Sequence, residues 1–159
     1  MSVSTHIMEL VRQVRGSTIE LLEAARPDWL LWAPVGTSNH ILWHAGHAIW
    51  LQEALCLQPL TGQSHLQPGW AETFGMNCRP PAETQNWPSR ESLAFQLRLQ
   101  LEEILMACTR HADRLEAAEP EPARGRGLVP GILHGLHDEA RHQGEMYLLL
   151  KLCRSGRAG

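Results

Sequence analysis

The sequence predicts an all-α fold, a four-helix bundle with a long crossover between its second and third helices. Apolar residues recur at three- and four-residue steps in four separate stretches of the chain, which is the spacing of amphipathic helices. No stretch shows the alternating apolar and polar pattern of half-buried strands. Residues 58–88 are rich in proline and glycine and too long for a tight turn, so they predict the crossover.

The first helix is expected from Ser4 to about Ala25, where Pro27 ends it. Its apolar residues follow mixed three- and four-residue steps, and only Gly16 interrupts them. Residues 28–36 contain two tryptophans and a proline, so we expect an apolar connection that closes one end of the bundle.

The second helix is expected to begin at an N-cap provided by Thr37, Ser38 or Asn39. It should run to about Leu57 and stop before Pro59, because proline interrupts helical hydrogen bonding. In the crossover that follows, residues 69–78 carry a tryptophan and a phenylalanine and are expected to cover a pocket.

The third helix is expected to start at Ser89 and to continue to about Ala117. Residues 119–127 are polar and rich in helix breakers, so they predict a link. The fourth helix should carry Pro130 in its first turn and end near Cys153. Residues 154–159 are expected to form a frayed tail.

Composition narrows the class of protein. With 159 residues, 19% of them charged and 43% hydrophobic, the chain has the size and balance of one folded domain, 1–159. A formal charge of −3 leaves no basic surplus for phosphates, so we expect no nucleic-acid partner. No secretion signal and no membrane-spanning run is recognisable, so a cytoplasmic protein without membrane contact is expected.

The last helix carries the pattern with the clearest chemistry. Asp138 and His142 are four residues apart and therefore about 40° apart around the helix axis, so they can converge on one point. Such a pair on an inward face is half of a metal site. His137 lies about 140° from His142 and cannot share that point. Glu139 and Glu145, each three residues from His142, are expected to flank and support it.

A third ligand is expected from the second helix. His40, His44 and His47 follow i, i+4, i+7 spacing and form one stripe on that helix. If the stripe faces the last helix, one of these histidines completes the site, and facing helices of a bundle hold such ligands rigidly.

The segments Asn39–His47 and Asp138–Met146 together resemble the DinB/YfiT-like superfamily of metal-dependent enzymes. Members of that family typically bind a divalent metal through one histidine of the second helix and two residues of the last. The resemblance therefore implies His47, Asp138 and His142 as metal ligands. His44 and His40 are expected as their neighbours in the stripe, with His44 as a hydrogen-bond donor to the ligands. Many relatives have histidine where this chain has Asp138.

A site with two histidines and one carboxylate leaves coordination positions open, as catalytic metal sites do. The ligand set suits Zn²⁺ or Ni²⁺ and also admits Fe²⁺. The resemblance implies a thiol-dependent transferase or isomerase, or a hydrolase, that acts as a homodimer on a small molecule. The thiol it implies is a low-molecular-weight one such as mycothiol or bacillithiol. The alternative is a metal-binding or stress-response protein without turnover.

Overall fold

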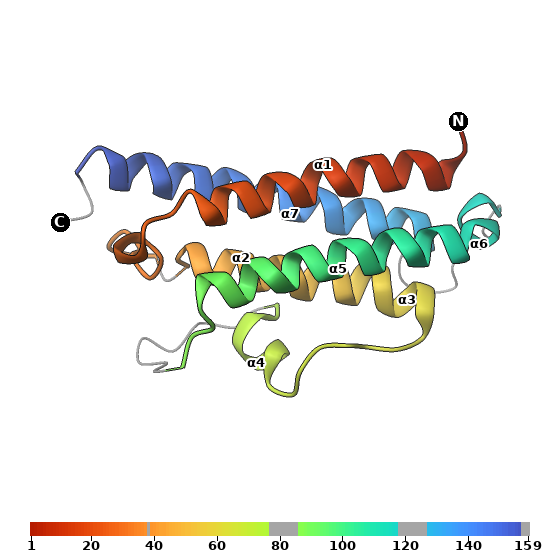
Figure 1. Ribbon diagram of the computed structural model, residues 1–159, viewed down its shortest axis with the longest axis horizontal. Helices are drawn as coiled ribbons and strands as arrows, with labels where there is room; N and C mark the ends of the chain where they lie inside the picture. Colours follow the sequence, from red (N-terminus) through yellow and green to blue (C-terminus); the bar gives the residue numbers. More distant parts are fainter. Residues whose placement is uncertain (38, 77–85, 118–126, 157–159) are drawn as a thin grey trace.

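A computed structural model describes residues 1–37, 39–76, 86–117 and 127–156. The longest helices in these ranges are α1, α2, α5 and α7 (Figure 1). They span Val3–Glu23, Ile41–Gln52, Arg90–Arg110 and Leu128–Arg154. No strand occurs in the described ranges, so the predicted all-α bundle is confirmed.

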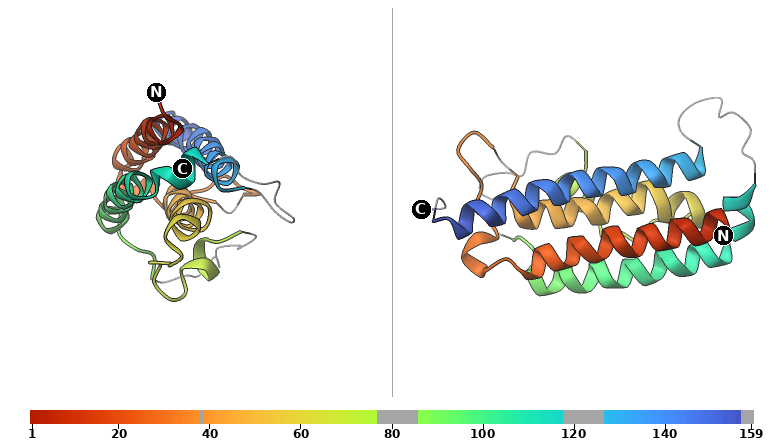
Figure 2. Two further views of the ribbon diagram at one scale, coloured as in Figure 1. Left: turned by 90° about the vertical axis from the view of Figure 1, so that its right-hand side faces the viewer. Right: turned by 90° about the horizontal axis from the view of Figure 1, so that it is seen from above.

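The four helices form a square in which α1 and α2 occupy one diagonal. Helix α1 contacts α5 and α7, and α2 contacts the same two helices. Figures 1 and 2 show that α1 and α7 run in one direction, while α2 and α5 run in the other. Because α2 and α5 are parallel neighbours, the chain between them must travel back along the bundle. The predicted crossover is therefore required by the topology.

The crossover contains two short helices, α3 (Gln58–Thr61) and α4 (Trp70–Phe74). Helix α4 lies on the outside of the bundle and packs against α2 (Figure 1). Residues 77 and 78 of the expected pocket cover lie outside the described ranges, as do 79–85.

Two details of the second helix differ from the prediction. The N-cap is His40, whose Nδ1 accepts a hydrogen bond of 3.1 Å from the Trp43 amide, in place of Thr37, Ser38 or Asn39. An imidazole nitrogen here replaces the usual hydroxyl or carboxylate oxygen.

The helix also continues past Pro59. A π-helical turn, Glu53–Leu57, follows α2 and leads directly into α3. In that turn the Gln58 amide bonds to the Glu53 carbonyl, five residues back. Pro59 then stands in the first turn of α3, where its missing N–H is tolerated, so the chain stays helical to Thr61.

The third and fourth helices match the prediction closely. Ser89 caps α5 by accepting a hydrogen bond from the Ser92 amide. His111 interrupts the helix, which resumes as α6 (Ala112–Glu116). Pro130 lies in the first turn of α7, whose last residue is Arg154. The expected link falls on residues 118–126 and the end of the expected tail on 157–159, all outside the described ranges.

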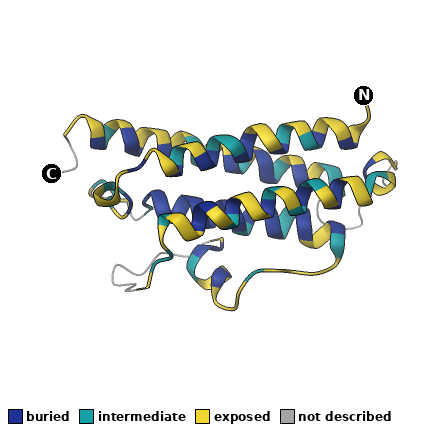
Figure 3. Cartoon of the chain, viewed as in Figure 1, coloured by how far each residue is buried: buried dark blue, intermediate teal, exposed yellow. Residues whose placement is uncertain are grey.

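Figure 3 shows that the buried residues of the long helices face the inside of the bundle. The buried apolar residues form two clusters, one that includes Leu22, Ile41 and Leu97 and another that includes Val11, Leu57 and Ile104. Along each long helical segment, buried polar residues separate the part that belongs to one cluster from the part that belongs to the other. These residues form a polar layer across the bundle; they are Arg15, Thr18, Gln52, Glu53, Gln100 and Glu139.

The apolar connection 28–36 was also correctly predicted, since Trp29 and Trp32 pack against the first cluster. None of the helices in the described ranges has the length and apolar character needed to cross a membrane.

Candidate metal centre

Three of the predicted residues meet between α2 and α7. His47 offers one ligand atom, Asp138 a second and His142 a third, and these atoms all lie within 4.8 Å of one another. His47 is buried, whereas Asp138 and His142 are partly exposed. The i, i+4 pair on α7 faces α2, because these two helices are antiparallel neighbours in the bundle.

The ring of His47 is fixed on both faces and at one nitrogen. It stacks on Trp43, with centroids 4.6 Å apart, and on Trp50, with centroids 5.4 Å apart. Its Nδ1 lies 2.5 Å from the carbonyl oxygen of Phe74 in α4. A carbonyl only accepts, so Nδ1 carries the proton and Nε2 keeps its lone pair. His47 therefore presents Nε2 as a ligand atom.

The ring of His142 is oriented by a chain of two residues. His44 Nε2 lies 3.2 Å from Glu145 Oε2, and His44 Nδ1 lies 2.9 Å from His142 Nδ1. An ionised carboxylate only accepts, so His44 carries its proton on Nε2, and its Nδ1 accepts from His142. His142 then has its proton on Nδ1 and a free lone pair on Nε2. Both histidines thus offer Nε2, the state a metal ligand needs.

Burial keeps these imidazoles neutral. It lowers the pKa of His44 to about 3 and that of His142 to about 4, with the neighbouring histidines adding to both shifts. It also lowers the pKa of His47, against the hydrogen bond to Phe74 and the charge of Asp138. The contact between His44 and Glu145 is therefore a hydrogen bond from a neutral ring. Neutral imidazole is the form that binds metals.

Asp138 supplies the negative charge of the centre. Its Oδ1 accepts a hydrogen bond of 3.2 Å from Arg141 Nη1, one turn further along α7. Within the described part of the chain Oδ2 has no partner, so it remains available to the cluster. The side chain of Asp138 is 14% exposed, which leaves the centre open on the α7 side.

A second group, His44, His142 and Glu145, also brings three ligand atoms within 4.8 Å. Two nitrogens bound to one tetrahedral Zn²⁺ at 2.0–2.1 Å lie about 3.4 Å apart. The Nδ1 atoms of His44 and His142 are only 2.9 Å apart, which is a hydrogen-bond distance. In the arrangement described, these two nitrogens therefore share a hydrogen bond rather than one ion.

The structure corrects the expected role of Glu139. Of the two carboxylates expected beside His142, Glu145 is there, but Glu139 faces α1. Its oxygens accept from Arg15 at 3.2 Å, from Thr18 at 2.7 Å and from Gln52 at 2.9 Å. Glu139 is fully buried and belongs to the polar layer of the bundle.

The other predicted histidines are only partly where the sequence placed them. His137 is exposed and belongs to neither ligand group, as expected. His40 is the N-cap of α2 and not a member of a stripe within the helix, and His44 contacts the ligand His142 but accepts the hydrogen bond instead of donating it. The role of Phe74 was missed, because a backbone carbonyl leaves no mark in the sequence. The positions of Trp43 and Trp50, four residues before and three after His47, could have indicated the ring sandwich.

The fold and the cluster define a class of protein: a helical bundle with a histidine and carboxylate group suited to a metal ion between two of its helices. A family model of the DinB superfamily matches residues 10–146, which covers all four main helices in large part. The chain belongs to the DinB superfamily. A search of curated proteins finds no match to it.

Proposed function

We propose that His47 Nε2, His142 Nε2 and one oxygen of Asp138 bind a single divalent metal ion. The observation that carries the proposal is that three ligand atoms converge within 4.8 Å while hydrogen bonds from the other side hold both imidazoles in the required tautomer. Ligands of this type suit Zn²⁺ or Ni²⁺ and also Fe²⁺. Oriented imidazoles with accepting partners are typical of metal centres in proteins.

We propose further that the centre is catalytic and that the protein is a metal-dependent transferase, isomerase or hydrolase acting on a small molecule. A metal ion held there would supply the Lewis acidity that activates a thiol or a water. Three protein ligands suffice to fix the ion and leave room for such a group. Glu145 and His44 hold the His142 ring, while Trp43 and Trp50 exclude water from both faces of His47.

The second candidate function is metal binding without turnover, and one observation favours it. Trp70 and Phe74 of α4 are 7% and 2% exposed and fill the space beside His47. No channel to the centre is therefore expected through α4. Access from the α7 side, where Asp138 and His142 are partly exposed and Glu145 is exposed, supports the catalytic function instead.

Metal content of the untagged protein tests the centre. We expect about one transition-metal ion per chain by mass spectrometry, and its loss in His47→Ala, Asp138→Ala and His142→Ala. The matched control is His137→Ala, which removes an exposed histidine next to Asp138 and should leave the metal content unchanged. Wild-type protein that stays metal-free after incubation with Zn²⁺, Ni²⁺ and anaerobic Fe²⁺ would contradict the proposal.

Turnover is tested separately from metal binding. Loaded protein is incubated with low-molecular-weight thiols and electrophilic or hydrolysable substrates, and product is followed by chromatography. Activity that is lost in Asp138→Ala and retained in His137→Ala supports an enzyme. Metal-loaded protein that turns over none of these substrates supports the non-catalytic function.

A further inference from the structure

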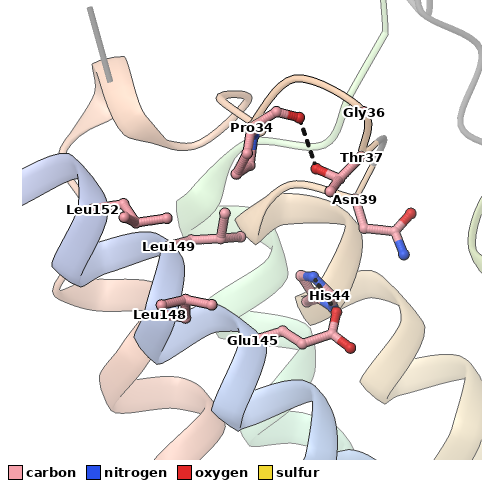
Figure 4. Close-up of a pocket in the computed structure, with 9 residues that line it drawn as sticks. All are labelled: Pro34, Gly36, Thr37, Asn39, His44, Glu145, Leu148, Leu149 and Leu152. Atoms are coloured by element: carbon pink, nitrogen blue, oxygen red, sulfur yellow. Dashed lines mark hydrogen bonds and ion pairs between the residues drawn. The ribbon is translucent and has the colours of Figure 1, made fainter. Parts of the chain in front are cut away.

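A cavity of about 780 Å³ lies beside the candidate metal centre, between α7 and the loop that precedes α2 (Figure 4). Leu148, Leu149 and Leu152 of α7 line one side. Pro34 and Thr37 of the loop line another, and a hydrogen bond of 2.9 Å between the Thr37 hydroxyl and the Pro34 carbonyl closes the loop on itself. Cavities of this size accommodate small organic molecules.

The cavity has an apolar side and a charged end. Figure 4 shows the three leucines following one another along α7, with Glu145 and His44 at the end of the row. From Glu145 to Leu152 the helix rises about 10 Å, close to the length of an aliphatic chain of about eight carbons. A ligand lying along α7 would therefore place an alkyl chain on the leucines and its head group at Glu145.

The negative charge at one end of the cavity favours a ligand with a positively charged head group. Among the described residues that line it, Glu145 is the one with a formal charge, since His44 is neutral. Glu145 Oε2 is engaged by His44, whereas Oε1 accepts no hydrogen bond from any described residue, and the side chain is 56% exposed. Partial burial raises the pKa of Glu145, and the positive charge of Arg141 opposes that shift. Arg141 lies nearby, but its guanidinium bonds to Asp138.

The same end of the cavity adjoins the centre. Glu145 lies three residues after His142 on α7, and His44 contacts His142 directly at 2.9 Å. A head group on Glu145 is therefore separated from the metal ligands by one turn of helix. The atoms next to that head group are the part of the ligand nearest to the centre.

We propose that this cavity is the substrate-binding site and that it takes an aliphatic primary amine, with the ammonium group on Glu145 and the alkyl chain on Leu148, Leu149 and Leu152. An ammonium ion can donate a charge-assisted hydrogen bond to Oε1, and it brings the positive charge that the residues lining the cavity do not provide. A carboxylate head group would meet the like charge of Glu145. This inference relies on the proposed metal centre for chemistry but not for binding.

Three ligands of equal chain length test the proposal: octylamine, octan-1-ol and octanoate, each titrated into metal-free protein and followed by isothermal calorimetry and amide NMR shifts. We expect octylamine to bind about tenfold more tightly than octanol, and octanoate more weakly than octanol. Shifts should map to Thr37, Glu145 and Leu148. Equal affinity for the amine and the carboxylate, or no binding of any of the three, would overturn the proposal.

Variants separate the head-group site from the alkyl site. Glu145→Gln should reduce octylamine affinity to that of octanol and leave octanol unchanged. Leu148→Asn, at an exposed position, should weaken all three ligands alike. The matched control is Glu102→Gln, an exposed carboxylate on α5 outside the cavity, and it should change nothing. Octylamine affinity that survives Glu145→Gln would exclude Glu145 as the head-group site.

The two proposals fail in different ways. Selective amine binding by a protein that takes up no metal would leave the cavity assignment intact and remove the metal centre. Metal uptake that depends on His47, Asp138 and His142, without amine selectivity, would do the reverse. The pair of experiments therefore decides each proposal independently.

Discussion

Arg15 and Glu139 form a buried ion pair between α1 and α7. Both side chains are almost fully buried, with a nitrogen-to-oxygen distance of 3.2 Å. Burial lowers the pKa of Arg15, although the Glu139 carboxylate opposes the shift. The Nε and Nη1 atoms of Arg15 have no hydrogen-bond partner in the described structure. Arg15 therefore depends on Glu139 for much of its compensation.

We expect Glu139→Ala to lower the free energy of unfolding by about 3–5 kcal/mol, because it leaves the Arg15 charge buried without a partner. Denaturation in urea measures the change. Replacing both residues with methionine should recover most of the loss, since an apolar pair leaves no uncompensated charge. The control Glu102→Ala, at an exposed site, should stay within about 0.5 kcal/mol of wild type.

Acid sensitivity is a second prediction at this scale. His40, His44 and His142 have folded pKa values of about 4, 3 and 4, against an ordinary value of 6.5. As the pH falls below 6.5, these histidines become protonated in the unfolded chain, whereas in the folded chain they stay neutral until about pH 4. Stability is therefore complete above pH 6.5 and declines towards pH 4, by about 1.4 kcal/mol per pH unit for each proton.

Urea unfolding of metal-free protein at pH 7, 6 and 5 measures this decline. His40→Asn keeps an N-cap side chain but removes one titrating group, so it should flatten the decline by about one proton. His137→Ala, at an exposed site, should leave the slope unchanged. Equal stability from pH 7 to pH 5 would contradict the prediction.

Much of the centre could be predicted at the residue scale, because helical spacing alone brings Asp138 and His142 together. The supporting carboxylates show the limit. Glu139 and Glu145 lie symmetrically on either side of His142, about 60° away in opposite directions. Only the rotation of α7 against its neighbours decides which one meets His44, and tertiary packing sets that rotation. Residue spacing therefore predicted both carboxylates beside His142, and the prediction for Glu139 is wrong.

At the scale of elements, Gly46 allows α4 to approach α2. A Cβ atom at this position would lie 2.3 Å from the ring of Phe74, and Trp70 Nε1 donates to the Gly46 carbonyl at 3.1 Å. The close approach brings the Phe74 carbonyl within reach of His47. The cap at His40 and the continuation through Pro59 depend on similar local packing, so neither could be predicted from residue spacing.

We expect Gly46→Ala to displace the Phe74 ring, to cost about 1–3 kcal/mol, and to weaken metal binding about 10- to 100-fold by loosening the support of His47. Fluorescence of Trp43 and Trp50, which flank His47, reports the metal titration. Gly16→Ala is the control: nothing lies within 4 Å of its new Cβ, so it should stabilise α1 by about 0.5–1 kcal/mol. Unchanged metal affinity in Gly46→Ala would separate α4 from the centre.

At the scale of the whole molecule, the polar layer between the two apolar clusters favours one alignment of the helices. Sliding α7 by one turn against α1 would separate Glu139 from Arg15 and bury both charges unpaired. The topology was predictable because a long connection between the second and third helices permits parallel neighbours. The homodimer expected from the family resemblance stays a prediction, which sedimentation velocity can test.

The antiparallel contact between α2 and α7 joins residues far apart in the chain: His44 and His142 are separated by 98 positions. The ligands are therefore not brought together in the unfolded chain. Bringing them together requires the long chain segment between α2 and α7 to close into a loop. An ion that binds only the folded state adds about 2.7 kcal/mol of stability at a hundredfold excess over its Kd.

We expect that gain to appear in the unfolding rate, because contacts formed after the transition state slow unfolding and leave folding unchanged. Stopped-flow kinetics with and without Zn²⁺ measure both rates, and faster refolding with metal would show that α2 and α7 meet early. If α2 and α7 meet late in folding, the bound ion slows the unfolding of the native protein without changing its folding rate. Metal-starved chains would then open more often and become the first molecules of this protein that a protease can cut.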